Sequence, residues 1–163
     1  MRQGRTGYEL GQDVRVHTVT VGREDDGLQL SDVERGPDGE IWYVWVRLRV
    51  GGLDASLQVS SHYATGFTEL VGFFRELAAD WRGWRGERIY ESMEHELRLT
   101  ASHDGHVRIA VQLHRSNLPE EWSASGVFSV DAGEELTRAT ENVTDLLSLH
   151  RVCPKVRVAT RFK

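Results

Sequence analysis

The sequence predicts an α+β protein in which an antiparallel β-sheet of about six to eight strands carries two amphipathic helices on one face. Two hairpin patterns, at residues 44–59 and 95–114, join alternating apolar and polar runs through glycine-containing turns. Two further stretches, residues 65–82 and 131–147, repeat apolar side chains at helical spacing. The resulting order of strands, helix, strands and helix favours a sheet with both helices packed on its buried side.

The length and composition indicate one domain, spanning residues 1–163. The apolar content is sufficient for a core, and the single cysteine excludes an internal disulfide framework. Residues 1–12 follow no pattern and are expected to be irregular. Residues 151–163 hold five cations and no acid, and we interpret them as a basic C-terminal arm or a charged edge strand.

The N-terminal third is expected to form short strands. Apolar alternation over residues 14–21 changes phase, which indicates a strand with a bulge near His17 and Thr18. Residues 28–30 suggest another short strand, and the Gly-Pro-Asp-Gly run at 36–39 predicts a turn.

The first hairpin has a glycine pair at residues 51–52, which suits a two-residue type I′ turn because both central positions need positive φ angles. This turn fixes a tight register in which Val50 lies opposite Leu53 and Arg49 lies opposite Asp54. The same register brings all the apolar residues of both runs onto one face.

The first helix is expected to be capped by Thr65 and to continue to about Arg82, where Gly83 stops it. Phe73 lies at the edge of the apolar stripe and is expected to be partly exposed. The stripe consists of Phe67, Leu70, Val71, Phe74, Leu77, Ala78 and Trp81.

The register of the second hairpin is chosen by its apolar pattern. A two-residue turn at 104–105 would place apolar residues on both faces, whereas a three-residue loop at 103–105 keeps them on one. The longer loop predicts three apolar pairs: Leu97 with Val111, Leu99 with Ile109 and Ala101 with Val107.

The last third predicts a strand over residues 122–130 and a helix after Asp131. Asp131 and Glu134 have the spacing of a capping box, and Pro154 lies beyond the helix end.

Charge and motifs exclude several classes of function. The net charge is −5, and the +5 of residues 151–163 leaves −10 on residues 1–150, so nucleic acid is not the expected main partner. A contact between nucleic acid and the basic arm is a third, weaker alternative. The sequence has no membrane-spanning apolar run, signal peptide, phosphate-binding loop or dinucleotide fingerprint. We therefore expect a cytoplasmic protein without a cofactor.

Two histidines flank the second turn and are the only metal-ligand candidates. His103 and His106 can hold zinc if further ligands converge on them, but no second ligand cluster is visible. Turn formation by Asp104 and Gly105 with solvated histidines explains the same residues, so no metal is expected.

The predicted register also places possible acid–base groups together. Glu94 lies opposite His114, and a carboxylate that orients an imidazole can support proton transfer. His95 is two residues before Leu97 and so falls on the same face of the predicted strand. It is expected to point inward, toward a pocket between helices and sheet. Cross-strand pairs of this kind are also ordinary surface contacts, so no catalytic residue is assigned.

The polar face of the sheet is the candidate partner-binding surface. Large aromatics next to arginine are residue types that anchor protein interfaces, and partial covering of this face by other segments is the competing explanation. The candidates are Tyr43, Trp45, Arg47, Glu94, Glu96, Arg98, Arg108 and His114.

Three sequence blocks carry a family resemblance: ADWRGWRGER at 79–88, ESMEHELRLTASHDGHVRIAVQL at 91–113, and WSASGVFSVDAGEEL at 122–136. With them the chain resembles a small actinobacterial family of unknown function over about residues 42–149. The resemblance implies a bacterial cytoplasmic α+β protein and no catalytic residues. The size, acidity and layout also resemble those of immunity proteins from bacterial toxin systems. A non-enzymatic protein-binding module, immunity-type in this analogy, is the leading expectation, and a small-molecule-binding protein or enzyme is the alternative.

Overall fold

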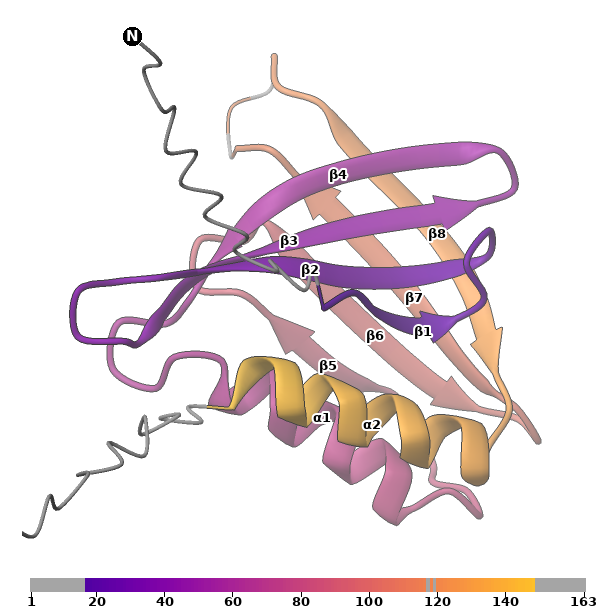
Figure 1. Ribbon diagram of the computed structural model, residues 1–163. Helices are drawn as coiled ribbons and strands as arrows, with labels where there is room; N and C mark the ends of the chain where they lie inside the picture. Colours follow the sequence, from indigo (N-terminus) through magenta and orange to yellow (C-terminus); the bar gives the residue numbers. More distant parts are fainter. Residues whose placement is uncertain (1–16, 117, 119, 149–163) are drawn as a thin grey trace, which may run out of the picture.

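The computed structural model describes residues 17–148 except 117 and 119, and within them eight strands and two helices form an α+β fold (Figure 1). The antiparallel strands divide into two four-stranded sheets, each in chain order. The first sheet contains β1 (Val19–Gly22), β2 (Gly27–Arg35), β3 (Ile41–Val50) and β4 (Leu53–Ser60). The second contains β5 (Arg88–Glu91), β6 (Leu97–His103), β7 (Val107–His114) and β8 (Ser123–Val130). The helices are α1 (Thr68–Ala79) and α2 (Glu134–Leu147).

The first hairpin has the predicted register. Val50 pairs with Leu53 and Arg49 with Asp54 across β3 and β4. The φ angles of the two turn glycines at 51–52 are 56° and 87°, which are the left-handed values that the type I′ turn needs.

The second hairpin keeps the predicted faces, but the predicted register is wrong by two residues. Leu97 pairs with Leu113 rather than Val111, and His103 pairs with Val107 around a loop of residues 104–106. A two-residue shift leaves the alternation unchanged, so the apolar pattern does not distinguish the two registers. Local hydrogen bonds favour the later loop: the Asp104 amide donates to the His106 carbonyl over 3.1 Å, and the Gly105 amide donates to the His103 ring.

The strand at residues 28–30 is longer than predicted, because β2 continues through two bulges. The β2–β3 register shifts on either side of Glu34. Asp32 has a φ of 48°, the left-handed conformation found at such irregularities, and Trp42 is the extra residue on β3. The turn at 36–39 forms as expected, with the Gly39 amide bonded to the Gly36 carbonyl.

Both helices begin later than their predicted caps. Thr65 does not cap α1, which starts at Thr68 without a side-chain cap. The capping box of Asp131 and Glu134 does not form either; Glu135 instead accepts the Asp131 amide hydrogen bond over 2.9 Å. Phe73 is buried rather than partly exposed, because it packs beside Tyr90 of β5.

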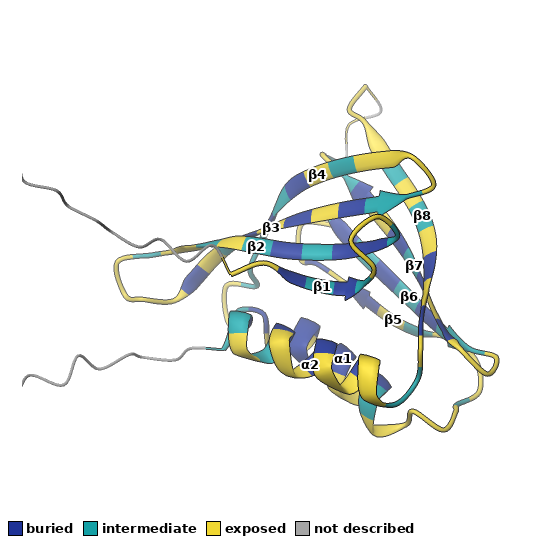
Figure 2. Ribbon diagram, turned by 45° about the vertical axis from the view of Figure 1, so that its right-hand side comes forward, coloured by how far each residue is buried: buried dark blue, intermediate teal, exposed yellow. Residues whose placement is uncertain are grey.

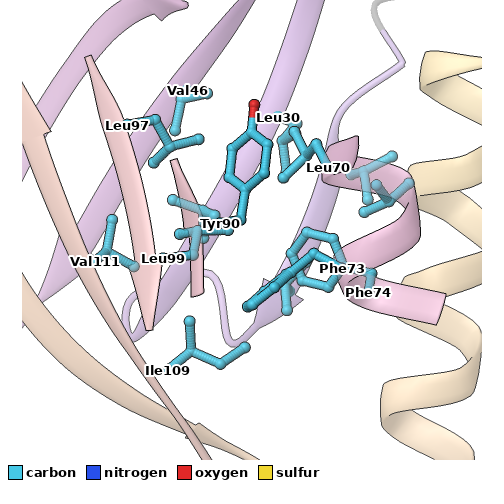
Figure 3. Packing of buried hydrophobic residues seen from close by; sticks show 14 of the residues in the cluster. Leu30, Val46, Leu70, Phe73, Phe74, Tyr90, Leu97, Leu99, Ile109 and Val111 are labelled. Atoms are coloured by element: carbon cyan, nitrogen blue, oxygen red, sulfur yellow. The ribbon is translucent and has the colours of Figure 1, made fainter. Parts of the chain in front are cut away.

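One continuous core lies between the inner faces of the two sheets and the helix pair. Figure 2 shows buried and exposed residues alternating along the strands of both sheets, and the buried ones form one cluster with those of the helices. In Figure 3, Val46 of the first sheet lies near Leu97 of the second, and Leu30 of the first sheet lies near Tyr90 of the second. The sequence patterns gave no sign that the strands divide into two opposed sheets.

The helices contact each other and lie beside the edge strands β1 and β5, at one side of the paired sheets (Figures 1 and 2). The Thr140 hydroxyl of α2 donates a buried 3.2 Å hydrogen bond to the Phe74 carbonyl of α1. No helix in the described part of the chain is long and apolar enough to cross a membrane. The predictions for residues 1–12 and 151–163, and for Val14 and Val16, concern residues outside the described part.

Candidate protein-binding surface

The two sheets divide the eight residues predicted to form one binding surface. Tyr43, Trp45 and Arg47 lie on β3 of the first sheet. The other five lie on the second sheet or in its turn between β5 and β6: Glu94, Glu96, Arg98, Arg108 and His114. Because the inner faces of the sheets oppose each other, outward side chains of one sheet point away from those of the other. A single surface containing all eight residues does not exist.

Trp45 lies at the centre of the outer face of the first sheet. It pairs with Ser31 of β2 on one side and Gln58 of β4 on the other. Alternation turns Val44 and Val46 inward and leaves Trp45 42% exposed. No described segment covers the centre of this face, which we call the Trp45 face; it comprises Ser31, Tyr43, Trp45, Arg47, Asp54 and Gln58.

Arg47 is held in place on the Trp45 face by a bidentate ion pair. Its Nε and Nη2 atoms donate to the two carboxylate oxygens of Asp54 over 2.7 and 2.5 Å. These hydrogen bonds, with the attraction between the charges, raise the pKa of Arg47 and lower the pKa of Asp54. Arg49, the predicted partner of Asp54, lies directly opposite in register, but its Nε is 3.8 Å away.

This role of Asp54 was not predicted from the sequence. Arg47 and Asp54 are diagonal neighbours across β3 and β4, a spacing that long side chains can bridge. The Gly-Gly turn fixes the register, so the diagonal pair was available as a signal in the sequence.

Glu96 has a structural role rather than a place on an open surface. Its Oε1 accepts hydrogen bonds from the Ser60 hydroxyl over 2.8 Å and the Ser60 amide over 3.3 Å. Its Oε2 accepts one from the Ser92 hydroxyl over 3.1 Å. Glu96 therefore ties the end of β4 to the turn between β5 and β6, and with it one sheet to the other.

Arg98 and Arg108 are engaged in local ion pairs on the outer face of the second sheet. Arg98 Nη1 lies 3.5 Å from Glu91, and Arg108 Nε lies 3.2 Å from Asp104. Both pairs are partly exposed, so each contributes little to stability.

The proposed acid–base pair of Glu94 and His114 does not form. The observed register places His114 opposite Glu96, whose carbonyl accepts the His114 amide hydrogen bond over 2.9 Å. His95 was expected to point inward, but it sits in an exposed turn with a φ of 61° and contacts Glu91 over 2.8 Å. A residue with a left-handed backbone breaks the alternation of a strand. His95 therefore does not lie on the same face as Leu97, contrary to what the alternation predicted.

His103 has both ring nitrogens committed to the protein. Nδ1 accepts the Gly105 amide hydrogen bond over 3.2 Å, so Nε2 donates to the Trp81 carbonyl, 2.9 Å away. His106 lies 3.4 Å from Asp131 on the surface. Among the described residues, no three His, Cys, Asp or Glu side chains gather as a possible metal site.

Surface hollows of about 560, 540 and 600 Å³ lie in the described structure, and none of these is lined by Glu94, His95 or His114. The hollow of about 600 Å³ lies between the start of α1 and the end of α2, with Ile41, Phe67, Val71 and Leu147 as its apolar lining and Arg75 at its side.

The fold and the Trp45 face define a two-sheet α+β protein with an aromatic residue and a paired arginine exposed on one sheet. The chain belongs to the family described as "Family of unknown function (DUF6228)", which matches residues 19–150. No curated protein and no solved structure matches the chain.

Proposed function

We propose that the chain is a non-enzymatic protein-binding module and that the Trp45 face is its binding surface. The observation that carries this proposal is the exposed indole of Trp45 at the centre of a sheet face, next to an arginine already held in its ion pair. Tryptophan and arginine supply much of the energy at protein interfaces when they become buried. The surrounding Ser31 and Gln58 supply polar groups suited to a rim.

Preorganisation supports the choice of this surface. Because the bidentate contact with Asp54 favours one orientation of the Arg47 guanidinium, less side-chain freedom is lost when a partner binds. The rigid antiparallel pairing of β3 with both neighbouring strands likewise keeps Trp45 in place.

The test begins with capture of a partner by the full chain from the organism that encodes it, followed by titration of the purified partner. Trp45→Ala is expected to raise the dissociation constant at least about 30-fold, the effect of losing an interface anchor. Trp122→Ala is the matched control, since Trp122 is 37% exposed but adjoins the second sheet. Equal affinity of the Trp45→Ala variant and the wild type would contradict the proposal.

The specific form of binding that we propose is inhibition of the immunity type. Residues 1–150 carry a net −10, which suits a basic partner. Co-expression with a toxin encoded beside the gene is expected to protect cells, and Trp45→Ala should abolish protection while Trp122→Ala retains it. Loss of protection in both variants would point to another surface.

We place this activity in the cytoplasm of an actinobacterium. Arginine outnumbers lysine 18 to 2, as expected of a GC-rich coding sequence, and there is one cysteine in the chain. Fractionation of native cells tests the location, and recovery outside the cytoplasm would contradict it.

The hollow beside α1 favours a second candidate, the binding of a small amphiphilic anion. Its apolar lining and Arg75 suit such a ligand, and Gly72 opens onto it with no atom near its missing Cβ. Gly72→Leu is expected to fill the hollow and abolish binding of any small molecule found by ligand-observed NMR. Protein binding through Trp45 should survive this substitution, which separates the two candidates.

A further inference from the structure

Strand β8 forms an edge of the second sheet. It pairs with β7 along its whole length, from Ser123 to Val130. No other described strand pairs with it, and no other described backbone group hydrogen-bonds to it. Its sequence, SASGVFSV, contains no charge and no proline, the residues that usually prevent an edge strand from pairing with another chain.

The other three sheet edges among the described strands are covered or charged. Helix α2 lies beside β1 and helix α1 beside β5 (Figure 1). The remaining edge, β4, carries Asp54, and its last amide, that of Ser60, is bonded to Glu96. Protection is therefore absent only from β8 within the described part of the chain.

A cross-strand row on the outer face of the second sheet, with exposed aliphatic residues at both ends and a threonine and an alanine between them, leads to this edge. Ile89 lies opposite Thr100, Thr100 opposite Ala110, and Ala110 opposite Val127. The two ends of the row, Ile89 and Val127, are 52% and 54% exposed. The row stops at Val127 because the sheet stops there.

We infer that two copies of this chain pair antiparallel through β8, with a two-fold axis at Val127. An antiparallel strand pair has the symmetry of a C2 dimer, so one strand can bind its own copy. In this register Val127 faces Val127 of the second copy, and Ser125 faces Ser129.

This register is consistent with the residues on both faces. On the outer face, the row from Ile89 to Val127 of one copy meets the same row of the other copy at the aliphatic side chains of Val127. On the inner face, Gly126 faces Phe128 of the second copy, so the large ring lies beside a residue with no side chain. No pair of like charges is brought together along the strand. The second sheet of one copy and the second sheet of the other become one sheet of eight strands.

The test measures self-association of the full chain by sedimentation equilibrium. The wild type is expected to be a dimer at micromolar concentration. Val127→Lys places two ammonium groups opposite each other and should raise the dimer dissociation constant at least about tenfold. Ile89→Lys is the matched control, because Ile89 has the same exposure on the same row but belongs to the opposite edge. The control should dimerise like the wild type.

A charge-swap experiment tests the two-fold axis directly. Val127→Glu alone should weaken the dimer as Val127→Lys does, whereas an equimolar mixture of the two variants should form a heterodimer. Circular dichroism and thermal unfolding verify that each variant is folded.

Three results would overturn the inference: a monomeric wild type, a Val127→Lys variant that dimerises as tightly as Ile89→Lys, or equal loss of dimer in both. In a monomeric wild type, slow amide hydrogen exchange along β8 would show that another segment of the same chain covers the edge. Fast exchange would show that the edge is open.

Discussion

The carboxylate of Glu96 accepts a 2.8 Å hydrogen bond from the hydroxyl of Ser60 and thereby joins the two sheets at one end. Three donors converge on this carboxylate, two from Ser60 and one from Ser92. Ser92 in turn accepts the Leu97 amide hydrogen bond over 3.0 Å. The residue expected to contact a partner is therefore part of the link between the sheets.

Replacing Glu96 is expected to destabilise the fold. Glu96→Ala leaves the Ser60 and Ser92 donors without their acceptor and should lower the free energy of unfolding by about 1–3 kcal/mol. Glu94→Ala, two residues away in the same exposed turn, should change it by less than about 0.5 kcal/mol. Urea unfolding measures both values, and equal effects would show that Glu96 does not link the sheets.

Tyr90 makes the stability sensitive to alkaline pH. Burial raises the pKa of its phenol above the ordinary value of 10.0, and the carboxylates of Glu69 and Glu96 raise it further. Both the folded and unfolded states keep the proton below pH 10. At higher pH the unfolded state loses the proton first, so stability falls by up to about 1.4 kcal/mol per pH unit until the folded-state pKa is reached.

Tyr90→Phe should therefore reduce the loss of stability between pH 9 and pH 11 compared with the wild type. Tyr63→Phe is the control, because Tyr63 is exposed. Urea unfolding at several pH values gives the comparison, and parallel wild-type and Tyr90→Phe curves would contradict the assignment.

Alanine substitutions at two glycines are expected to change the stability of the fold in opposite directions. Gly72 lies within α1 and Gly52 in the β3–β4 turn. At both, apart from the adjacent backbone, no atom lies within 4 Å of the position that a Cβ would occupy. Gly72→Ala should stabilise the protein by about 0.5–1 kcal/mol, because alanine favours the helix. Gly52→Ala should destabilise it by about 1–3 kcal/mol, since its φ of 87° is strained for any other residue. Changes of the same sign in thermal unfolding would contradict this reasoning.

The contact between the helices rests in part on Thr140. Thr140→Val removes the buried hydrogen bond to the Phe74 carbonyl at nearly constant volume and should cost about 0.5–1.5 kcal/mol. Thr137→Val, on the exposed side of the same helix, should cost less than about 0.5 kcal/mol. Denaturant unfolding of the two variants provides the measurement.

Local patterns predicted seven of the eight described strands and both helices, because alternation and helical spacing are local properties. Strand β5 was not predicted, since its four residues are too few for a recognisable alternation. The turn at 51–52 specified its register, since two glycines with positive φ allow only a tight loop. The turn near Asp104 did not, because two registers that differ by two residues bury the same side chains.

The relations between distant segments were not predictable from local patterns. The bond between Ser60 and Glu96 spans 36 residues, and no periodicity reports it. The division into two sheets was not predictable for the same reason. A pair of neighbouring strands has the same local pattern whether the strands belong to one sheet or to two. This division is also why the eight predicted binding residues separated into two groups.

Hydrogen exchange of the full chain, with and without its captured protein partner, tests the proposed binding surface most directly. Partner binding is expected to slow exchange in β3 and β4 around Trp45, while the second sheet away from the partner remains unchanged. Protection confined to the second sheet, or an unchanged first sheet at saturating partner, would contradict the proposed function.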